Sequence, residues 1–138
     1  FSPAEGRDFE YARKVWKPLF EKYGVDLVLN GHDHTYARGH VPVKSQNIDQ
    51  SGRFKTLYVT SVSGPKQYKV DRESIKNYGG DGYKSDKIGD QTQFFQVINV
   101  ENNKLIYSAY TTVGNLYDKA IITKDFLTGE KTISNSIK

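Results

Sequence analysis

The sequence contains no cysteine and no methionine among its 138 residues. Without cysteine, a disulfide scaffold, a thiolate zinc site and a cysteine nucleophile are all excluded. Histidine, aspartate, glutamate and asparagine remain as metal ligands, and serine and threonine remain as nucleophiles. Without methionine the chain has no initiator residue, so we expect Phe1 to be an internal position, a processing site or an artificial boundary, and the chain to be a fragment of a longer protein.

The sequence also lacks a long hydrophobic run. No apolar stretch approaches the roughly 20 residues that a membrane-spanning helix needs, and the first residues do not resemble a signal peptide. Hydrophobic residues make up 36% of the chain and charged residues 26%, which is typical of a folded protein and not of a disordered tail. We therefore expect at most one ordinary domain and no membrane span.

The net charge is small. The chain has 20 lysines and arginines against 16 aspartates and glutamates, which gives +4. The lysines are spread along the chain and are mostly flanked by acidic residues. This pattern predicts a weak attraction to anions and does not favour a nucleic-acid partner.

The N-terminal part of the sequence predicts a helix followed by a strand. Apolar residues recur at intervals of three and four from Asp8 to Tyr23, with Asp8 as the N-cap and Gly24 as the stop signal. Trp16 lies on the apolar face of this helix, so we expect it in the core. The apolar run from Val25 to Leu29 predicts a strand that is buried on both faces. A helix that leads into such a strand indicates an α/β fold.

The rest of the sequence predicts mainly strands and loops. We expect a loop over Thr35 to Arg53, a strand over Leu57 to Val62, and a polar, irregular segment over Lys66 to Thr92 with a short helical stretch near Arg72 to Lys76. Alternating apolar residues then predict two hairpins, one from Gln93 to Val100 with Lys104 to Thr112, and one from Lys119 to Thr123 with Lys131 to Ile133.

Two histidines follow the first predicted strand, in the run Gly31, His32, Asp33, His34. Open α/β sheets bind ligands at the carboxyl ends of their strands, and a glycine before the histidines lets the chain turn so that both rings reach one site. Neutral imidazole nitrogens bind zinc, iron and manganese, and two ligands this close in sequence suit a pair of metal ions. From these residues alone, the alternative is a pair of surface histidines at a strand end.

Residues 23–38, which read YGVDLVLNGHDHTYAR, closely resemble the last motif of the calcineurin-like metallophosphoesterases, and of purple acid phosphatases in particular. The resemblance extends back through residues 16–19 in the predicted helix. It continues more loosely through residues 58–64 and fades beyond about Thr112.

The resemblance implies a fold. Members of that family are sandwiches of two mixed sheets flanked by helices. This chain would then be α/β, the C-terminal half of such an αββα sandwich, with a mixed sheet and its N-terminal helix packed on it. Residues 1–112 would form the C-terminal part of the catalytic domain, and residues 113–138 would be a strand or hairpin extension of the same domain.

The resemblance also implies an activity for the intact parent protein. Members of the family hold two metal ions, which can be iron, zinc or manganese, and these activate water to hydrolyse phosphate esters. His32 matches the ligand to the second metal and His34 the ligand to the first. Because such enzymes are often exported, a periplasmic or extracellular location is implied by the resemblance alone.

The family's earlier motifs are missing from this sequence. They supply a metal-binding Asp, a bridging Asp, an Asn and a further His. Two imidazoles cannot hold two metal ions, so we expect this chain alone to be inactive and to require the missing N-terminal half of the domain. For the same reason we expect exposed apolar surface and self-association of the isolated chain.

Two further residues are candidate substrate contacts. Arg7 lies where purple acid phosphatases carry substrate-contacting histidines, and it could touch a phosphate. Tyr36 could line the site, although a structural role is equally supported for it and for Arg38, which would pair with a carboxylate. We expect His40 to be solvated or hydrogen-bonded in the predicted loop, and not to bind metal.

Residues 66–87 support an alternative function from another class. Basic and aromatic side chains interleave there, which could make a polyanion-binding or protein-binding surface on a non-catalytic α/β module. These side chains are Lys66, Tyr68, Lys69, Arg72, Lys76, Tyr78 and Tyr83. Asp71, Glu73 and Asp81 interrupt the positive field, which favours a solvated loop over such a surface.

Overall fold

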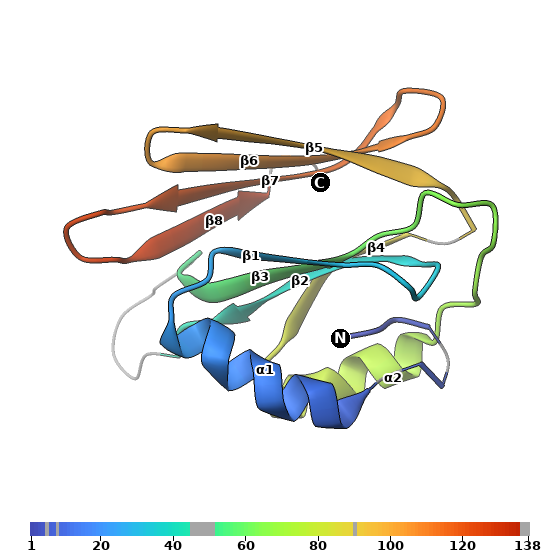
Figure 1. The fold of residues 1–138 in the computed structure, drawn as a ribbon, viewed down its shortest axis with the longest axis horizontal. Coiled ribbons are helices and arrows are strands. Elements are labelled where there is room, and N and C mark those ends of the chain that lie inside the picture. Colours follow the sequence, from blue (N-terminus) through green and yellow to red (C-terminus); the bar gives the residue numbers. More distant parts are fainter. Residues whose placement is uncertain (5, 8, 45–51, 90, 136–138) are drawn as a thin grey trace.

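The chain forms two stacked sheets with helices on one outer face. The computed structural model describes residues 1–4, 6–7, 9–44, 52–89 and 91–135. In chain order its elements are α1 (Glu10–Lys22), β1 (Leu27–Asn30), β2 (Tyr36–Pro42), β3 (Phe54–Thr60), α2 (Arg72–Asn77), the 3-10 helix η1 (Tyr78–Asp81), β4 (Lys84–Gly89), β5 (Phe94–Glu101), β6 (Lys104–Thr111), β7 (Leu116–Lys124) and β8 (Lys131–Asn135). Figure 1 shows α1 and α2 beneath the first sheet, on the side away from the second. The α/β class is therefore confirmed.

The first sheet is mixed. Its strand order is β1-β3-β2-β4, with β1 parallel to β3 and the other neighbours antiparallel. Helix α1 packs on it near the helix C-terminus, where Phe20 meets a buried cluster that contains Tyr58 of β3. A mixed sheet with the N-terminal helix packed on it was expected from the sequence, and both features are present.

Helix α1 matches its prediction in extent but not in burial. It ends at Lys22, and Gly24 follows with φ of +64°, the left-handed conformation that suits glycine. Asp8, the predicted N-cap, lies outside the described residues. Trp16 is 55% exposed, so its expected place in the core is wrong. The helix is anchored near Phe20, while Trp16 lines a groove between α1 and the sheet.

Strand β2 corrects the predicted loop over Thr35 to Arg53. The turn-forming Gly39 and Pro42 suggested a loop, yet β2 is an inner strand and is the most continuously buried in the first sheet. Gly39 is required there because a Cβ at this position would collide with the ring of Tyr83. Its partner β4 was also missed, because this edge strand lies within the polar stretch predicted as irregular.

Strand β1 is the opposite edge of the same sheet. The sequence predicted a strand buried on both faces, but Leu27 and Val28 are only partly buried and Leu29 is 55% exposed. The near-continuous apolar sequence therefore predicted the strand correctly but overestimated its burial. Among the described residues, β1 pairs only with β3, and its other edge has no neighbouring strand.

The second sheet confirms both predicted hairpins. Its strand order is β5-β6-β7-β8, all antiparallel, so β7 and β8 of the predicted extension 113–138 complete the sheet that β5 and β6 begin. The two sheets enclose the core. Its buried residues include Tyr36, Leu57, Val59, Phe94, Tyr107 and Ile122.

A buried ionic network joins the two sheets. Arg38 of β2 donates through Nε and Nη2 to both carboxylate oxygens of Asp118 in β7, at 2.7 and 2.9 Å. Its Nη1 donates to Asp86 of β4 at 3.1 Å and to Asn135 of β8 at 2.9 Å. The predicted structural pairing of Arg38 with a carboxylate is confirmed. His40 lies 2.7 Å from the Asp86 carboxylate and is buried in β2, so it is hydrogen-bonded in a strand and not solvated in a loop.

The Arg38–Asp118 pair should dominate stability. Replacing Arg38→Ala leaves the Asp118 carboxylate buried without its cation, and we expect the free energy of unfolding to fall by about 3–5 kcal/mol. Urea denaturation followed by circular dichroism measures this change. Lys104→Ala, at an exposed position of β6, should change it by less than about 0.5 kcal/mol. Equal midpoints for the two variants would show that the pair does not hold the sheets together.

Several of the exposed large apolar side chains lie on α1 and on β5. On α1 they are Tyr11, Val15, Trp16 and Leu19, and on β5 they are Phe95, Val97, Ile98 and Val100. β5 is also an edge strand, so its unpaired backbone groups lie beside these side chains. Among the described residues, no helix is long and apolar enough to cross a membrane.

This surface leads us to expect self-association of the isolated chain. Light scattering should give an apparent mass that rises with protein concentration. A lysine on the β5 edge, introduced as Val97→Lys, should shift that rise to higher concentration, since charge on an edge strand opposes pairing. Lys119→Arg in β7, which keeps the charge, serves as the control. A monomer mass at every concentration would contradict the expectation.

Candidate metal centre

The two candidate ligands lie in the loop after β1, at the carboxyl end of that strand. Because β1 and β3 are parallel, their last residues, Asn30 and Thr60, meet at the same edge of the sheet. The turn is made by the histidines themselves, since φ is +76° at His32 and +49° at His34. The sequence had assigned the sharp turn to Gly31. Left-handed backbone at residues other than glycine is strained and is concentrated at functional sites.

His34 is held by the loop that follows β3. Its Nδ1 lies 3.0 Å from the carbonyl oxygen of Lys66, and the amide of Tyr68 donates to the carbonyl of His34 at 3.1 Å. The Tyr68 ring meets the imidazole edge to face, with 5.0 Å between centroids. A carbonyl can only accept, so Nδ1 carries a proton, and in the neutral ring Nε2 then has the lone pair. This is the arrangement in which a histidine binds metal through Nε2.

His32 is exposed and lies against Arg7. Nη2 of Arg7 donates to Nδ1 of His32 at 2.5 Å and lies 3.3 Å from Nε2. A guanidinium can only donate, so the ring nitrogen is the acceptor in this contact. Asp33 Oδ1 lies 3.7 Å from Arg7 Nε, which places a carboxylate beside the cation. The structure therefore brings Arg7, His32 and Asp33 together, with His34 in the same turn.

These residues fit part of a metal centre. Neutral imidazole is a suitable ligand for zinc, iron or manganese, and His34 has the second-sphere hydrogen bond that such ligands usually make. Arg7 contacts both ring nitrogens of His32, so a metal ion on His32 requires Arg7 to move. Across the described ranges, no group of three or more His, Cys, Asp or Glu side chains could hold a metal ion. Further ligands are needed from outside these residues.

Tyr36 lies elsewhere. It is fully buried between the sheets, where its hydroxyl donates to Asp118 at 2.8 Å and lies 3.1 Å from the hydroxyl of Tyr107. Burial, followed by the nearby Tyr107 and Asp118, raises the pKa of Tyr36. A side chain with no exposed surface does not contact substrate, so Tyr36 has the structural role that the sequence left open.

Lys66 and Tyr68 also lie at the candidate site, whereas the sequence had placed them only in the alternative surface over residues 66–87. The sequence predicted a strand over Leu57 to Val62 but not its direction relative to β1. Had the sequence shown that this strand is parallel to β1, residues 63–68 would have been expected beside the histidines, because parallel strands end at the same edge of a sheet. Tyr68 is flanked by two cations, with Arg7 and Lys66 each 5.0 Å from its ring centroid.

The alternative surface over residues 66–87 is only partly formed. Tyr78 and Tyr83 are buried, and both rings pack against Phe1. Of the tyrosines in that segment, Tyr68 is the one left at the surface, beside His34. Core packing therefore accounts for Tyr78 and Tyr83, while Lys66, Lys69 and Arg72 are exposed.

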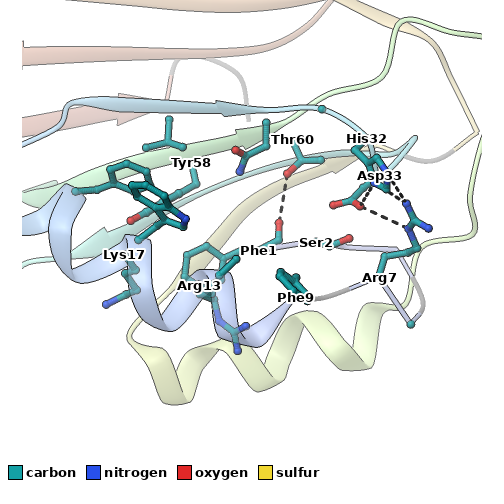
Figure 2. Close-up of a pocket in the computed structure, with 17 residues that line it drawn as sticks. Phe1, Ser2, Arg7, Phe9, Arg13, Lys17, His32, Asp33, Tyr58 and Thr60 are labelled. Carbon is teal, nitrogen blue, oxygen red and sulfur yellow. Dashed lines mark hydrogen bonds and ion pairs between the residues drawn. The ribbon is translucent and has the colours of Figure 1, made fainter.

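A groove lies next to the histidine loop. It has a volume of about 960 Å³ and runs between α1 and β1 to His32 and Asp33. Figure 2 shows Arg7, His32 and Asp33 at one end, with Phe9, Arg13 and Lys17 of the helix region along the groove.

The environment of Tyr68 can be tested by its ionisation. A hydrogen bond with the Lys66 ammonium lowers the pKa of Tyr68, so the phenol should ionise below the usual tyrosine range. The difference between the phenolate absorbance titrations of the wild-type chain and Tyr68→Phe isolates this group. Lys66→Gln should raise the midpoint, while Lys69→Gln, in the same segment, should not. An unchanged midpoint in Lys66→Gln would show that the contact is not made.

Comparisons with known proteins match only a short stretch of the chain. No family model and no solved structure matches it. Two curated proteins of Mycobacterium tuberculosis match: uncharacterized protein MT2654 of strain CDC 1551 / Oshkosh and uncharacterized protein Rv2577 of strain ATCC 25618 / H37Rv. Each is 57% identical over 28 residues, which are 20% of this chain and 5% of the relative. The chain thus aligns with a small part of each relative's length.

Proposed function

We propose that this chain is the C-terminal part of the catalytic domain of a metal-dependent phosphoesterase, similar to the calcineurin-like enzymes and to purple acid phosphatases in particular. In this proposal His32 and His34 are its contribution to a dinuclear metal centre. The observation that carries it is the state of His34: Nδ1–H is bound to the Lys66 carbonyl, and Nε2 is left as a ligand, in a strained turn at a strand's carboxyl end. The resemblance of residues 23–38 to the family's last motif supplies the reaction class.

In the proposed centre, the metal ions and the residues of this chain have different roles. Bound metal ions of this kind lower the pKa of a bound water and neutralise charge on the phosphoryl oxygens. The chain's own residues position that chemistry. The loop at Lys66 and Tyr68 fixes the ring orientation of His34, and Arg7 offers a guanidinium to an anionic ester beside His32.

The proposal requires a polypeptide partner, the remainder of the catalytic domain. It would supply the other metal ligands and the rest of an αββα sandwich, in which both sheets are covered by helices. Two surfaces of the chain are consistent with cover by such a partner. One is the exposed face of β5 at Phe95 and Val97, and the other is the unpaired edge of β1. Alone, the chain would bind metal weakly and would not turn over phosphate esters.

The test uses the intact parent protein that contains this sequence. His32→Ala and His34→Ala should each lower the metal content per polypeptide, measured by elemental analysis. Each should lower kcat/KM for an aryl phosphate by about 100-fold or more, because loss of a direct ligand exceeds loss of a second-sphere contact.

The control is His40→Gln, which removes the chain's third imidazole. His40 is buried in β2 against Asp86, so this variant should lose stability but keep its metal in the folded fraction. Unchanged metal content and turnover in both His32→Ala and His34→Ala would overturn the proposal.

A further inference from the structure

Two large apolar side chains stand at the tip of the β7–β8 hairpin. Leu127 is 98% exposed and Phe126 is 70% exposed. Figure 1 shows this turn, in red, projecting beyond the neighbouring β5–β6 turn and beyond α1. Exposed apolar side chains that gather at one place on a protein mark contact with another protein or with a membrane.

Hydrogen bonds within the turn fix its backbone. The Asp125 carboxylate accepts from the amide of Leu127 at 2.8 Å. The Asp125 amide donates to the carbonyl of Glu130 at 2.8 Å, and the Gly129 amide donates to the carbonyl of Asp125 at 2.8 Å. Because the turn is already ordered, burying its two apolar side chains against another surface would cost little further conformational entropy.

The hairpin tip and the histidine turn lie at opposite ends of β1. The ammonium of Lys124 lies 3.1 Å from the carboxylate of Asp26, just before β1. The ammonium of Lys131 donates to the carbonyls of Gly24 and Val25 at 3.2 and 3.0 Å. The histidine turn follows β1 instead. A surface that contacts the tip would therefore leave the candidate metal centre uncovered.

The rim of the tip has balanced charge. Lys124 and Asp125 precede the two apolar residues, and Glu130 and Lys131 follow them. Both lysines also form ion pairs with Asp26. With two cations and two anions the rim has no net charge, so attraction to an anionic surface is not expected from it. Contact at the tip would be driven by burial of the apolar side chains.

We propose that the β7–β8 tip inserts into the interfacial region of a lipid bilayer, with Phe126 and Leu127 at the acyl chains and the charged rim at the headgroups. The size of the tip favours lipid over a protein partner. An aromatic side chain buries about 150–250 Å², so two side chains fall well short of the roughly 1,000 Å² that a specific protein interface needs. A bilayer requires no complementary pocket, and a neutral rim suits zwitterionic headgroups.

Sedimentation with phosphatidylcholine vesicles tests the proposal. These vesicles have no net charge, so the +4 charge of the chain does not drive binding. Leu127→Ser and Phe126→Ser should each lower the partition coefficient of the 138-residue chain about tenfold, because each removes one buried apolar side chain. The matched control is Val113→Ser, which removes an 80% exposed side chain from the β6–β7 turn and should change nothing. Circular dichroism checks that each variant keeps its fold.

A tryptophan at the tip reports insertion directly. In the double variant Trp16→Phe with Phe126→Trp, the chain's one tryptophan lies at the tip. Its emission should shift to shorter wavelength on vesicles and should be quenched by lipids that are brominated on their acyl chains. Trp16 of the wild-type chain, which lines the groove at α1, should not be quenched. Quenching of Trp16 would place the membrane contact on α1 and overturn the proposal.

Two further outcomes would also overturn it. One is an absence of vesicle binding by the wild-type chain, or equal partition of Leu127→Ser and Val113→Ser. The other is a lower apparent mass of Leu127→Ser in light scattering with unchanged partition, which would make the tip a contact between copies of the chain. Because neither metal nor phosphate ester is used, the result is independent of the proposed phosphoesterase function.

Discussion

The ion pair between Arg38 of β2 and Asp118 of β7 crosses the interior between the sheets, where both side chains are buried. Because residues alternate between the faces of a strand, a one-residue slip of β2 would turn Arg38 away and leave Asp118 unpaired. The pair therefore fixes the register of β2, and with it the antiparallel partner β3. Tyr36 binds the same carboxylate two residues after His34, so the network also anchors the end of the histidine turn.

The candidate metal centre is built from two loops of the first sheet and not from a single sequence motif. The loop after β1 supplies the imidazoles, and the loop after β3 orients His34 through the Lys66 carbonyl and the Tyr68 amide. The parallel pairing of β1 with β3 brings the two loops together. The opposite edge of β1 has no neighbour among the described residues. Strand β1 thus carries the candidate ligands just past its carboxyl end and leaves one lateral edge of the sheet unpaired.

The sequence was informative where local pattern decides structure. The 3.6-residue period of α1 and the alternation in residues 93–112 gave the helix and the first hairpin, and the residues after β1 identified the histidine turn. Non-local packing decided the rest. Gly39 and Pro42 suggested a loop, yet Gly39 lies in β2 because the Tyr83 ring covers it. Trp16 had the spacing of a core residue but faces a groove, and strand direction, which determined the roles of Lys66 and Tyr68, was not encoded in any local pattern.

The left-handed backbone at His32 and His34 has a consequence for how this loop would change under selection. Each such residue costs on the order of 1 kcal/mol, and glycine or asparagine would adopt the same conformation more readily. The exposed His32 ring adds no core packing that offsets this cost. Laboratory evolution for thermal stability alone would therefore replace His32 early, whereas evolution for metal-dependent activity would retain it. The residue found at this position after selection would show whether the turn is retained for its backbone conformation or for its imidazole.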